Sequence, residues 1–127
     1  MGIEFIKIGV IGGGKTGTPL IQNLLQYDFI KLIGVADVSL EAIGVLLAKA
    51  KGIFITQDYM EIAHMDKKVD IIIDVSGDNK VREKIRTYFN ETNNRHTVLM
   101  PELIAVLMMS MAKGELIDTF HGYQVYN

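Results

Sequence analysis

The sequence contains no cysteine, and this absence limits both its chemistry and its expected location. A chain of 127 residues without thiols forms no disulfide bond, has no thiolate nucleophile and builds no cysteine-ligated zinc site. The composition fits a reducing compartment, so we expect a cytoplasmic protein. The three histidines are scattered, without a spacing such as H-E-x-x-H, and we therefore expect no bound metal.

Long apolar runs and blocks of positive charge are lacking as well. The longest uncharged apolar run, residues 103–112, is too short to cross a bilayer. The first residues, MGIEFIKIGV, lack the basic region of a secretory signal, so neither secretion nor a membrane is expected. The net charge is -2 and no basic block is present, which makes nucleic acid an unexpected partner.

Apolar residues are abundant, at 49% of the chain with a mean hydropathy of +0.23. A small single domain has a large surface for its volume and normally covers it with polar groups. We therefore expect one domain with part of its surface buried against a second copy. The segment Leu103 to Met111 is apolar almost all round, which places the expected homodimer contact there. The alternative is that the chain's own tail covers this segment.

Apolar segments alternate with segments of helical periodicity along the chain. The apolar segments predict five strands, at Phe5–Ile11, Phe29–Ala36, Ile53–Thr56, Val69–Val75 and His96–Met100. Helices are predicted at Thr16–Tyr27, from an N-cap at Ser39 to about Lys51, from Asp58, from Lys80 to about Asn90, and from Pro101 to about Ala112. The links are too long for hairpins. This predicts an α/β fold, a doubly wound parallel (Rossmann) sheet in the order 3-2-1-4-5 with helices on both faces. Residues 1–112 would form the dinucleotide-binding domain, and residues 113–127 a tail that is either a dimerisation arm or disordered.

The stretch GVIGGGKTG, residues 9–17, satisfies two phosphate-binding patterns. From Gly9 it matches G-x-x-x-x-G-K-T, the P-loop of magnesium-dependent ATP and GTP binders. From Gly12 it matches G-x-G-x-x-G, the turn that holds a dinucleotide. The run IIID, residues 71–74, adds support for the P-loop because such a strand can end in a magnesium-holding aspartate.

The surrounding chain favours the dinucleotide pattern. The first apolar run continues through Val10 and Ile11, which a P-loop would place in the phosphate loop. Gly17 has no required role in a P-loop, whereas in the dinucleotide pattern it permits close packing of the helix on the sheet. Asp37 ends the second apolar run, 25 residues after Gly12, near the spacing of a ribose-binding acid.

These residues support a family resemblance. The segments IKIGVIGGGKTG, LIGVAD and VDIIIDVSG resemble the N-terminal NAD(P)-binding domain of several oxidoreductases. These are the glucose–fructose oxidoreductase and inositol dehydrogenase family, homoserine dehydrogenase and dihydrodipicolinate reductase. The chain is also similar to nucleotide-binding domains found ahead of some bacterial sensor kinases. The resemblance covers roughly residues 4–112 and implies a bound dinucleotide.

The candidate cofactor-binding residues follow from the two patterns and the resemblance. They are Gly12, Gly13, Gly14, Lys15, Thr16, Gly17, Asp37, Ser76 and Gly77. The glycines would let the pyrophosphate approach the backbone at a helix N-terminus. Asp37 would accept hydrogen bonds from the adenosine ribose and repel a 2′-phosphate, which favours NAD over NADP. A ligand-free turn, a solvated Lys15 and a simple turn aspartate are the structural alternatives.

No catalytic residue can be assigned. In the glucose–fructose oxidoreductase family a Glu-Lys-Pro segment after the fifth strand supplies a catalytic lysine, and the stretch Leu99 to Glu102 (LMPE) has no lysine before its proline. The sequence also shows no second domain that would hold a substrate. Three functions therefore stay open. They are a standalone, NAD-preferring binding or sensing module, an oxidoreductase or its subunit with substrate groups from a partner, and a P-loop nucleotide binder.

Overall fold

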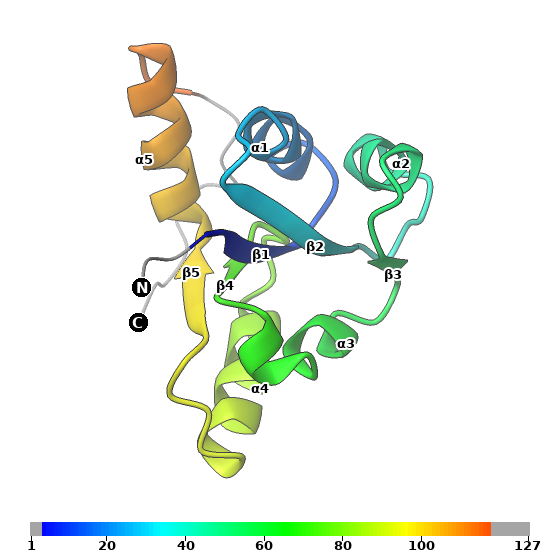
Figure 1. Cartoon of the computed structure of the whole chain (residues 1–127), viewed down its shortest axis with the longest axis vertical. Coiled ribbons are helices and arrows are strands. Elements are labelled where there is room, and N and C mark those ends of the chain that lie inside the picture. Colours follow the sequence, from blue (N-terminus) through cyan, green and yellow to red (C-terminus); the bar gives the residue numbers. More distant parts are fainter. Residues whose placement is uncertain (1–3, 118–127) are drawn as a thin grey trace.

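The structure, a computed structural model, describes residues 4–117 and contains one five-stranded sheet. The strands are β1 (Ile6–Ile11), β2 (Ile30–Ala36), β3 (Ile55–Thr56), β4 (Ile71–Asp74) and β5 (Val98–Pro101). They lie in the order β3-β2-β1-β4-β5, and all neighbouring pairs are parallel (Figure 1). The predicted fold class and strand order are confirmed.

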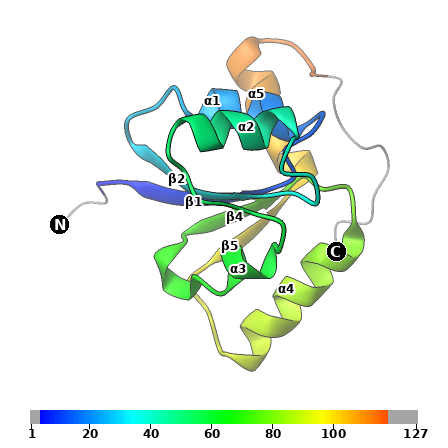
Figure 2. The same cartoon turned by 90° about the vertical axis from the view of Figure 1, so that its right-hand side faces the viewer.

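Helices cover both faces of the sheet (Figure 2). One face carries α1 (Gly17–Leu24), α2 (Ile43–Ala50) and α5 (Glu102–Lys113). The other carries α3 (Met60–Ala63) and α4 (Asn79–Glu91), with a 3-10 turn η1 (Asp66–Lys68) between them. Successive side chains of a strand point to opposite faces, so β4 gives Ile72 to the α3–α4 core and Ile73 to the α1–α2–α5 core.

The start of α2 differs from the prediction. The helix begins at Ile43 with Ala42 as its N-cap residue, so the predicted N-cap at Ser39 is wrong. The physical reason is a local turn, because the Asp37 Oδ1 atom accepts a hydrogen bond from the Ser39 N–H at 2.9 Å. Ser39 is thereby held in the loop that follows β2.

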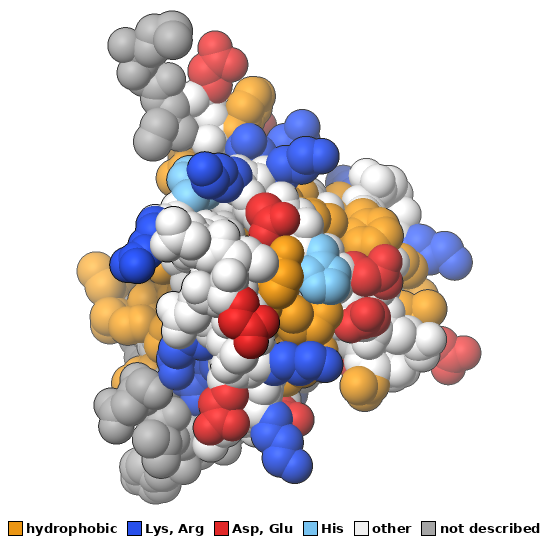
Figure 3. Space-filling model, turned by 90° about the horizontal axis from the view of Figure 1, so that it is seen from below, with side chains coloured by type: hydrophobic (Ala, Val, Ile, Leu, Met, Phe, Trp, Pro, Cys, Tyr) orange, Lys and Arg blue, Asp and Glu red, His pale blue; other side chains and the backbone are white. Residues whose placement is uncertain are grey.

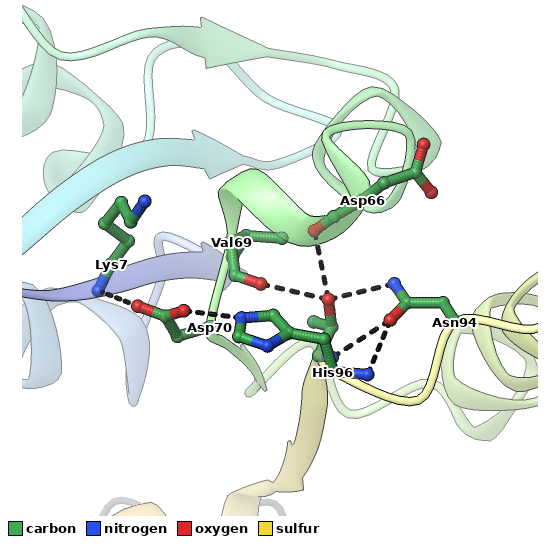
Figure 4. Close-up of polar contacts among 7 residues, drawn as sticks. Lys7, Asp66, Val69, Asp70, Asn94 and His96 are labelled. Atoms are coloured by element: carbon green, nitrogen blue, oxygen red, sulfur yellow. Dashed lines mark hydrogen bonds and ion pairs between the residues drawn. The ribbon is translucent and has the colours of Figure 1, made fainter.

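A polar junction holds β1, β4 and β5 together at the edge where the strands begin (Figure 4). The Asp70 carboxylate accepts a hydrogen bond from the Lys7 N–H at 2.8 Å and lies 2.7 Å from His96 Nε2. The Thr97 hydroxyl donates toward the carbonyl oxygens of Asp66 and Val69, at 3.0 and 2.9 Å. The Lys7 N–H and then His96 lower the pKa of Asp70 below its ordinary value.

We expect this junction to make folding sensitive to acid. A carboxyl group whose pKa is lowered by folding contributes stability above its unfolded pKa, and loses that contribution as the pH falls through its folded value. Asp70→Asn should therefore be less stable than wild type by about 1 kcal/mol at pH 7, and the difference should shrink below about pH 3.8. Urea denaturation at pH 7 and pH 3 measures both values. The exposed Asp28→Asn serves as the control, and a difference for Asp70→Asn that did not depend on pH would contradict this role.

The two faces of the molecule differ in the character of their exposed side chains. On the face formed by α3 and α4, acidic and basic side chains lie interspersed rather than in a field of one sign (Figure 3). On α5, by contrast, five apolar side chains are exposed, those of Leu103, Ile104, Leu107, Met108 and Met111. Within residues 4–117, no helix has the length and apolar character that a membrane span requires. The predicted tail, residues 113–127, falls mostly outside the described residues.

Candidate functional site

A pocket of about 370 Å³ opens where the strands end, beside the turn between β1 and α1. Four segments line it, each following one of the strands β1 to β4. The lining residues are Ile11, Gly12, Gly14, Lys15, Ala36, Asp37, Val38, Gln57, Tyr59, Val75, Ser76, Asp78 and Val81. Ligands of open parallel sheets bind at this edge, near the point where the strand order reverses, which here lies between β1 and β4.

The first glycine of the turn is shaped by its neighbours. Gly12 has a φ of +109°, which side-chain-bearing residues rarely adopt, and a Cβ there would lie 2.9 Å from the Val75 carbonyl group. The Gly12 N–H donates to the Ala36 carbonyl oxygen at 2.7 Å. The turn is therefore fixed between the ends of β2 and β4.

Gly13 and Gly14 differ in their surroundings. Gly13 is buried against α2, where a Cβ would meet the Val45 side chain at 2.8 Å, and its carbonyl oxygen accepts from the Gly44 N–H at 2.9 Å. Gly14 is exposed, and a Cβ there would find no atom within 4 Å. Gly14 is thus the point at which a ligand can approach the backbone at the start of α1.

Gly17 has the packing role that the dinucleotide pattern assigns to it. A Cβ at this position would lie 1.9 Å from the Gly12 carbonyl oxygen and 3.5 Å from the Val75 side chain. Only a residue without a side chain lets α1 approach the turn this closely. Gly17 contributes to the site through the position of α1, and it does not line the pocket.

Asp37 connects the end of β2 to the glycine turn. Its Oδ2 atom accepts a hydrogen bond from the Gly13 N–H at 2.6 Å, while Oδ1 accepts from Ser39. Each carboxylate oxygen can accept more than one hydrogen bond, so ribose hydroxyls could still bind there. The structure therefore brings Asp37 together with Gly12, Gly14 and Lys15 at one pocket.

Lys15 and Thr16 lie in opposite environments. Lys15 is exposed and is the only lysine or arginine among the lining residues. The Thr16 side chain is fully buried, and its hydroxyl donates to Glu102 Oε2 at 2.8 Å. Glu102, at the start of α5, is itself 1% exposed. Thr16 therefore ties the N-terminus of α1 to that of α5 beneath the site.

The turn after β4 forms the far rim of the pocket. Asp74 is buried, accepts hydrogen bonds from the N–H and hydroxyl of Ser76 at 3.0 and 2.6 Å, and lies 3.6 Å from Arg82 Nε. Burial raises the pKa of Asp74. Ser76 lines the pocket, whereas the predicted Gly77 does not and has a φ of +79°. Asp78 caps α4 through the Lys80 N–H at 2.9 Å and also lines the pocket.

The sequence analysis placed no candidate site residue after β3, although two lining residues lie there. Gln57 and Tyr59 follow the two-residue strand β3, and the Gln57 side-chain amide donates to the Val38 carbonyl oxygen at 3.0 Å. Burial, followed by Asp78, Asp58 and Asp74, raises the pKa of the Tyr59 phenol and favours its neutral form. Their place in the sequence could have predicted this role, since residues that directly follow a parallel strand lie at the edge of the sheet where ligands bind.

The contacts of the glycine stretch do not fit a P-loop. Gly9 lies within β1, paired with Gly34 and Ile72, so it is not the first residue of a phosphate loop. A Cβ at Gly9 would meet the Ile62 side chain at 2.5 Å, which gives this glycine a packing role. The Thr16 hydroxyl, the magnesium ligand of a P-loop, is buried against Glu102. Within residues 4–117, no cluster of three or more histidine or acidic side chains could hold a metal ion.

Comparison with solved structures places this geometry among known folds. The myo-inositol dehydrogenase of Corynebacterium glutamicum superposes with a TM-score of 0.61 at 20% identity, over 87% of this chain and 33% of that one. The homoserine dehydrogenase of Staphylococcus aureus gives 0.55 at 17% identity, over 84% and 29%. GenD2 of gentamicin A biosynthesis, solved in complex with NAD, gives 0.57 at 19% identity, over 88% and 32%.

The chain has a Rossmann fold. The resemblance to inositol and homoserine dehydrogenases that the sequence suggested is confirmed at the level of the fold. The chain spans about a third of the length of these three proteins. No protein-family model and no curated protein matches the sequence.

Proposed function

We propose that the chain binds a dinucleotide, with NAD preferred, in the pocket between the glycine turn and Asp37. The observation that carries this proposal is the open backbone at Gly14 next to the Asp37 carboxylate. A pyrophosphate would lie against Gly14 and Lys15, where the N-terminus of α1 and the lysine favour negative charge. The adenosine ribose would donate to Asp37, since a carboxylate at the end of the second strand accepts from its hydroxyls.

The charges around Asp37 support NAD over NADP. A 2′-phosphate on the ribose would bring negative charge next to this carboxylate. Asp78 lies on the same pocket and adds a second negative charge, while Lys15 lies in the glycine turn. A domain that binds NADP usually places an arginine near this position. The residues that directly follow Asp37 are Val38, Ser39 and Leu40, without a positive charge.

A binding or sensing module is the function that we favour for this domain. Bound NAD supplies hydride transfer where a protein places a substrate and a proton donor against it. In the resembling glucose–fructose oxidoreductase family, a catalytic lysine follows the fifth strand. At this position the chain has Pro101 and the buried Glu102, and no lysine lies between Leu99 and Glu102. The second candidate is an oxidoreductase whose substrate groups come from a partner, and it is supported by the dehydrogenases among the structural neighbours.

Nucleotide titration tests the proposal. We expect NADH to bind in the micromolar to millimolar range without magnesium, and NADPH to bind more weakly because of its 2′-phosphate. Isothermal calorimetry with NADH, NADPH and ATP, each with and without magnesium, measures the three affinities. Magnesium-dependent ATP binding without any dinucleotide signal would contradict the proposed site.

We also propose that two copies associate through α5. The exposed side chains Leu103, Ile104, Leu107, Met108 and Met111 carry no charge, so a symmetric contact that brings the same residues together meets no repulsion. Light scattering should give twice the chain mass of 14.2 kDa. Leu107→Glu should give the monomer, whereas Leu46→Glu, on an equally exposed apolar position of α2, should not. A wild-type monomer at micromolar concentration would refute the contact.

A further inference from the structure

A second groove, of about 1100 Å³, lies at the edge of the sheet where the strands begin. One wall is formed by η1 and the residues just before it, and the other by the C-terminal end of α4 and the loop that follows. Lys7, at the start of β1, lies between the two walls. The groove shares no lining residue with the pocket beside the glycine turn, so it is a separate surface that the proposed nucleotide site does not use.

Hydrogen bonds hold the two walls of this groove together. The Tyr88 hydroxyl on α4 donates to Asp66 Oδ1 at the start of η1, at 3.0 Å. The Thr97 hydroxyl lies 3.0 Å from the Asp66 carbonyl oxygen and ties the same residue to the start of β5. Asp66 and Asn93, one on each wall, have φ angles of +52° and +55°, which aspartate and asparagine adopt more readily than most residues. The shape of the groove is therefore fixed by contacts within the chain.

The acidic side chains of the groove are engaged by neighbouring hydroxyl groups. Asp66 accepts a hydrogen bond from Tyr88, and the Glu61 carboxylate accepts one from Thr56. The lysines differ from them. Within residues 4–117, no ion pair joins the ammonium group of Lys7, Lys67 or Lys68 to a carboxylate, and these three lysines therefore lack a negative partner in the described part of the chain.

Lys7 is the lysine with the most restricted surroundings. It is half-buried, while Lys67 and Lys68 are exposed. Its backbone N–H donates to Asp70, but its side chain extends away from that carboxylate (Figure 4). An ammonium group that has lost part of its hydration gains more from a negative partner than a fully solvated one does. The groove thus places a partly dehydrated positive charge beside two solvated ones.

The kind of positive charge indicates the class of ligand. The three lysines outnumber the two acidic side chains that line the groove, and no described arginine lines it. Lysine binds phosphate groups as a point charge with rotatable donors, whereas arginine is the usual choice for paired recognition of carboxylates. The volume exceeds the range of about 300–1,000 Å³ that is usual for small-molecule sites, so a ligand with more than one phosphate group has room.

We propose that this groove binds a small phosphate-bearing anion through the ammonium groups of Lys7, Lys67 and Lys68. It is a second ligand site, on the opposite edge of the sheet from the glycine turn. Lys7 contributes from β1, and Lys67 and Lys68 contribute from η1. Asp66 is a positioning residue, because its contacts with Tyr88 and Thr97 fix η1 relative to α4 and β5.

Titration of the whole chain with inorganic pyrophosphate, followed by amide NMR, tests this site. We expect a dissociation constant of about 1 mM or below, with shifts of the amide signals of Lys7 and of residues 66–69. The glycine turn can also bind this anion, so the titration is repeated with Lys15→Gln, which should leave the shifts at the groove unchanged. Shifts confined to residues 12–17 would overturn the second site while the proposed function stands. The absence of any shift at about 10 mM pyrophosphate would overturn it as well.

Lysine variants give the second readout. Lys7→Gln removes the ammonium group and keeps the backbone N–H that Asp70 accepts, and it should weaken pyrophosphate by about threefold. The double variant with Lys68→Gln should weaken it by about tenfold. Lys49→Gln, on an exposed lysine of α2 outside the groove, changes the net charge equally and should have no effect. Equal effects of Lys7→Gln and Lys49→Gln would show a response to net charge alone and overturn the site. Circular dichroism verifies that each variant is folded, and calorimetry with NADH should give the wild-type affinity for Lys7→Gln.

Discussion

Gly17→Ala is expected to destabilise the protein by about 3 kcal/mol, whereas Gly14→Ala should change stability by less than about 1 kcal/mol. The two glycines are three positions apart in one turn and differ in what a Cβ would meet. At Gly17 it would lie 1.9 Å from the Gly12 carbonyl oxygen, so α1 must move away from the sheet. At Gly14 it would meet nothing within 4 Å.

The two variants also separate folding from binding. Gly14→Ala should keep the wild-type stability and yet lose about tenfold in affinity for NAD, since its methyl group would occupy the approach to the backbone. Urea denaturation followed by circular dichroism gives the stabilities, and calorimetry gives the affinity. Equal stabilities of the two variants would show that Gly17 does not hold α1 against the turn.

Asp37→Ala should weaken NAD by about tenfold or more and weaken NADP much less. Removal of the carboxylate takes away the acceptor for the ribose hydroxyls, which weakens NAD binding. It also removes the repulsion of the 2′-phosphate, which favours NADP binding. The ratio of the two dissociation constants, measured by calorimetry, is therefore the decisive value. An unchanged ratio would remove Asp37 from the ribose site.

The contacts of Asp37 require a matched variant. Its carboxylate also accepts hydrogen bonds from Gly13 and Ser39, at 2.6 and 2.9 Å, so alanine could act through the turn rather than through the ligand. Asp37→Asn keeps a carbonyl acceptor and removes the charge. We expect it to shift the ratio toward NADP while it retains more affinity for NAD than alanine does. Asp58→Ala, exposed and outside the lining, controls for the loss of a nearby charge.

The sequence predicts the sheet well because its signals are local. The buried strands are nearly continuous apolar runs in the sequence. β1 continues through Val10 and Ile11, as its apolar run predicts. The role of Gly17 could be predicted because the dinucleotide pattern links this position to close packing of helix and sheet. The position of Asp37 at the pocket follows from the spacing of β1 and β2 in the same way.

The rest depends on contacts between distant segments. Thr16 completes the P-loop pattern and was a candidate cofactor contact, yet its side chain is buried against Glu102, 86 positions away in sequence. Tyr59 and Gln57 lie on the pocket because they follow β3. The sequence predicted the end of this strand at Thr56, but the phosphate-binding patterns give the two residues no role. The start of α2 at Ile43 depends on the Asp37–Ser39 turn, which the preference of serine for N-cap positions does not reveal.

The most direct measurement is an experimental structure of the chain with NAD bound. The account predicts the pyrophosphate against the backbone at Gly14 and Lys15, and the adenosine ribose within hydrogen-bonding distance of Asp37. Ligand density at another edge of the sheet, or a ribose that makes no contact with Asp37, would contradict it.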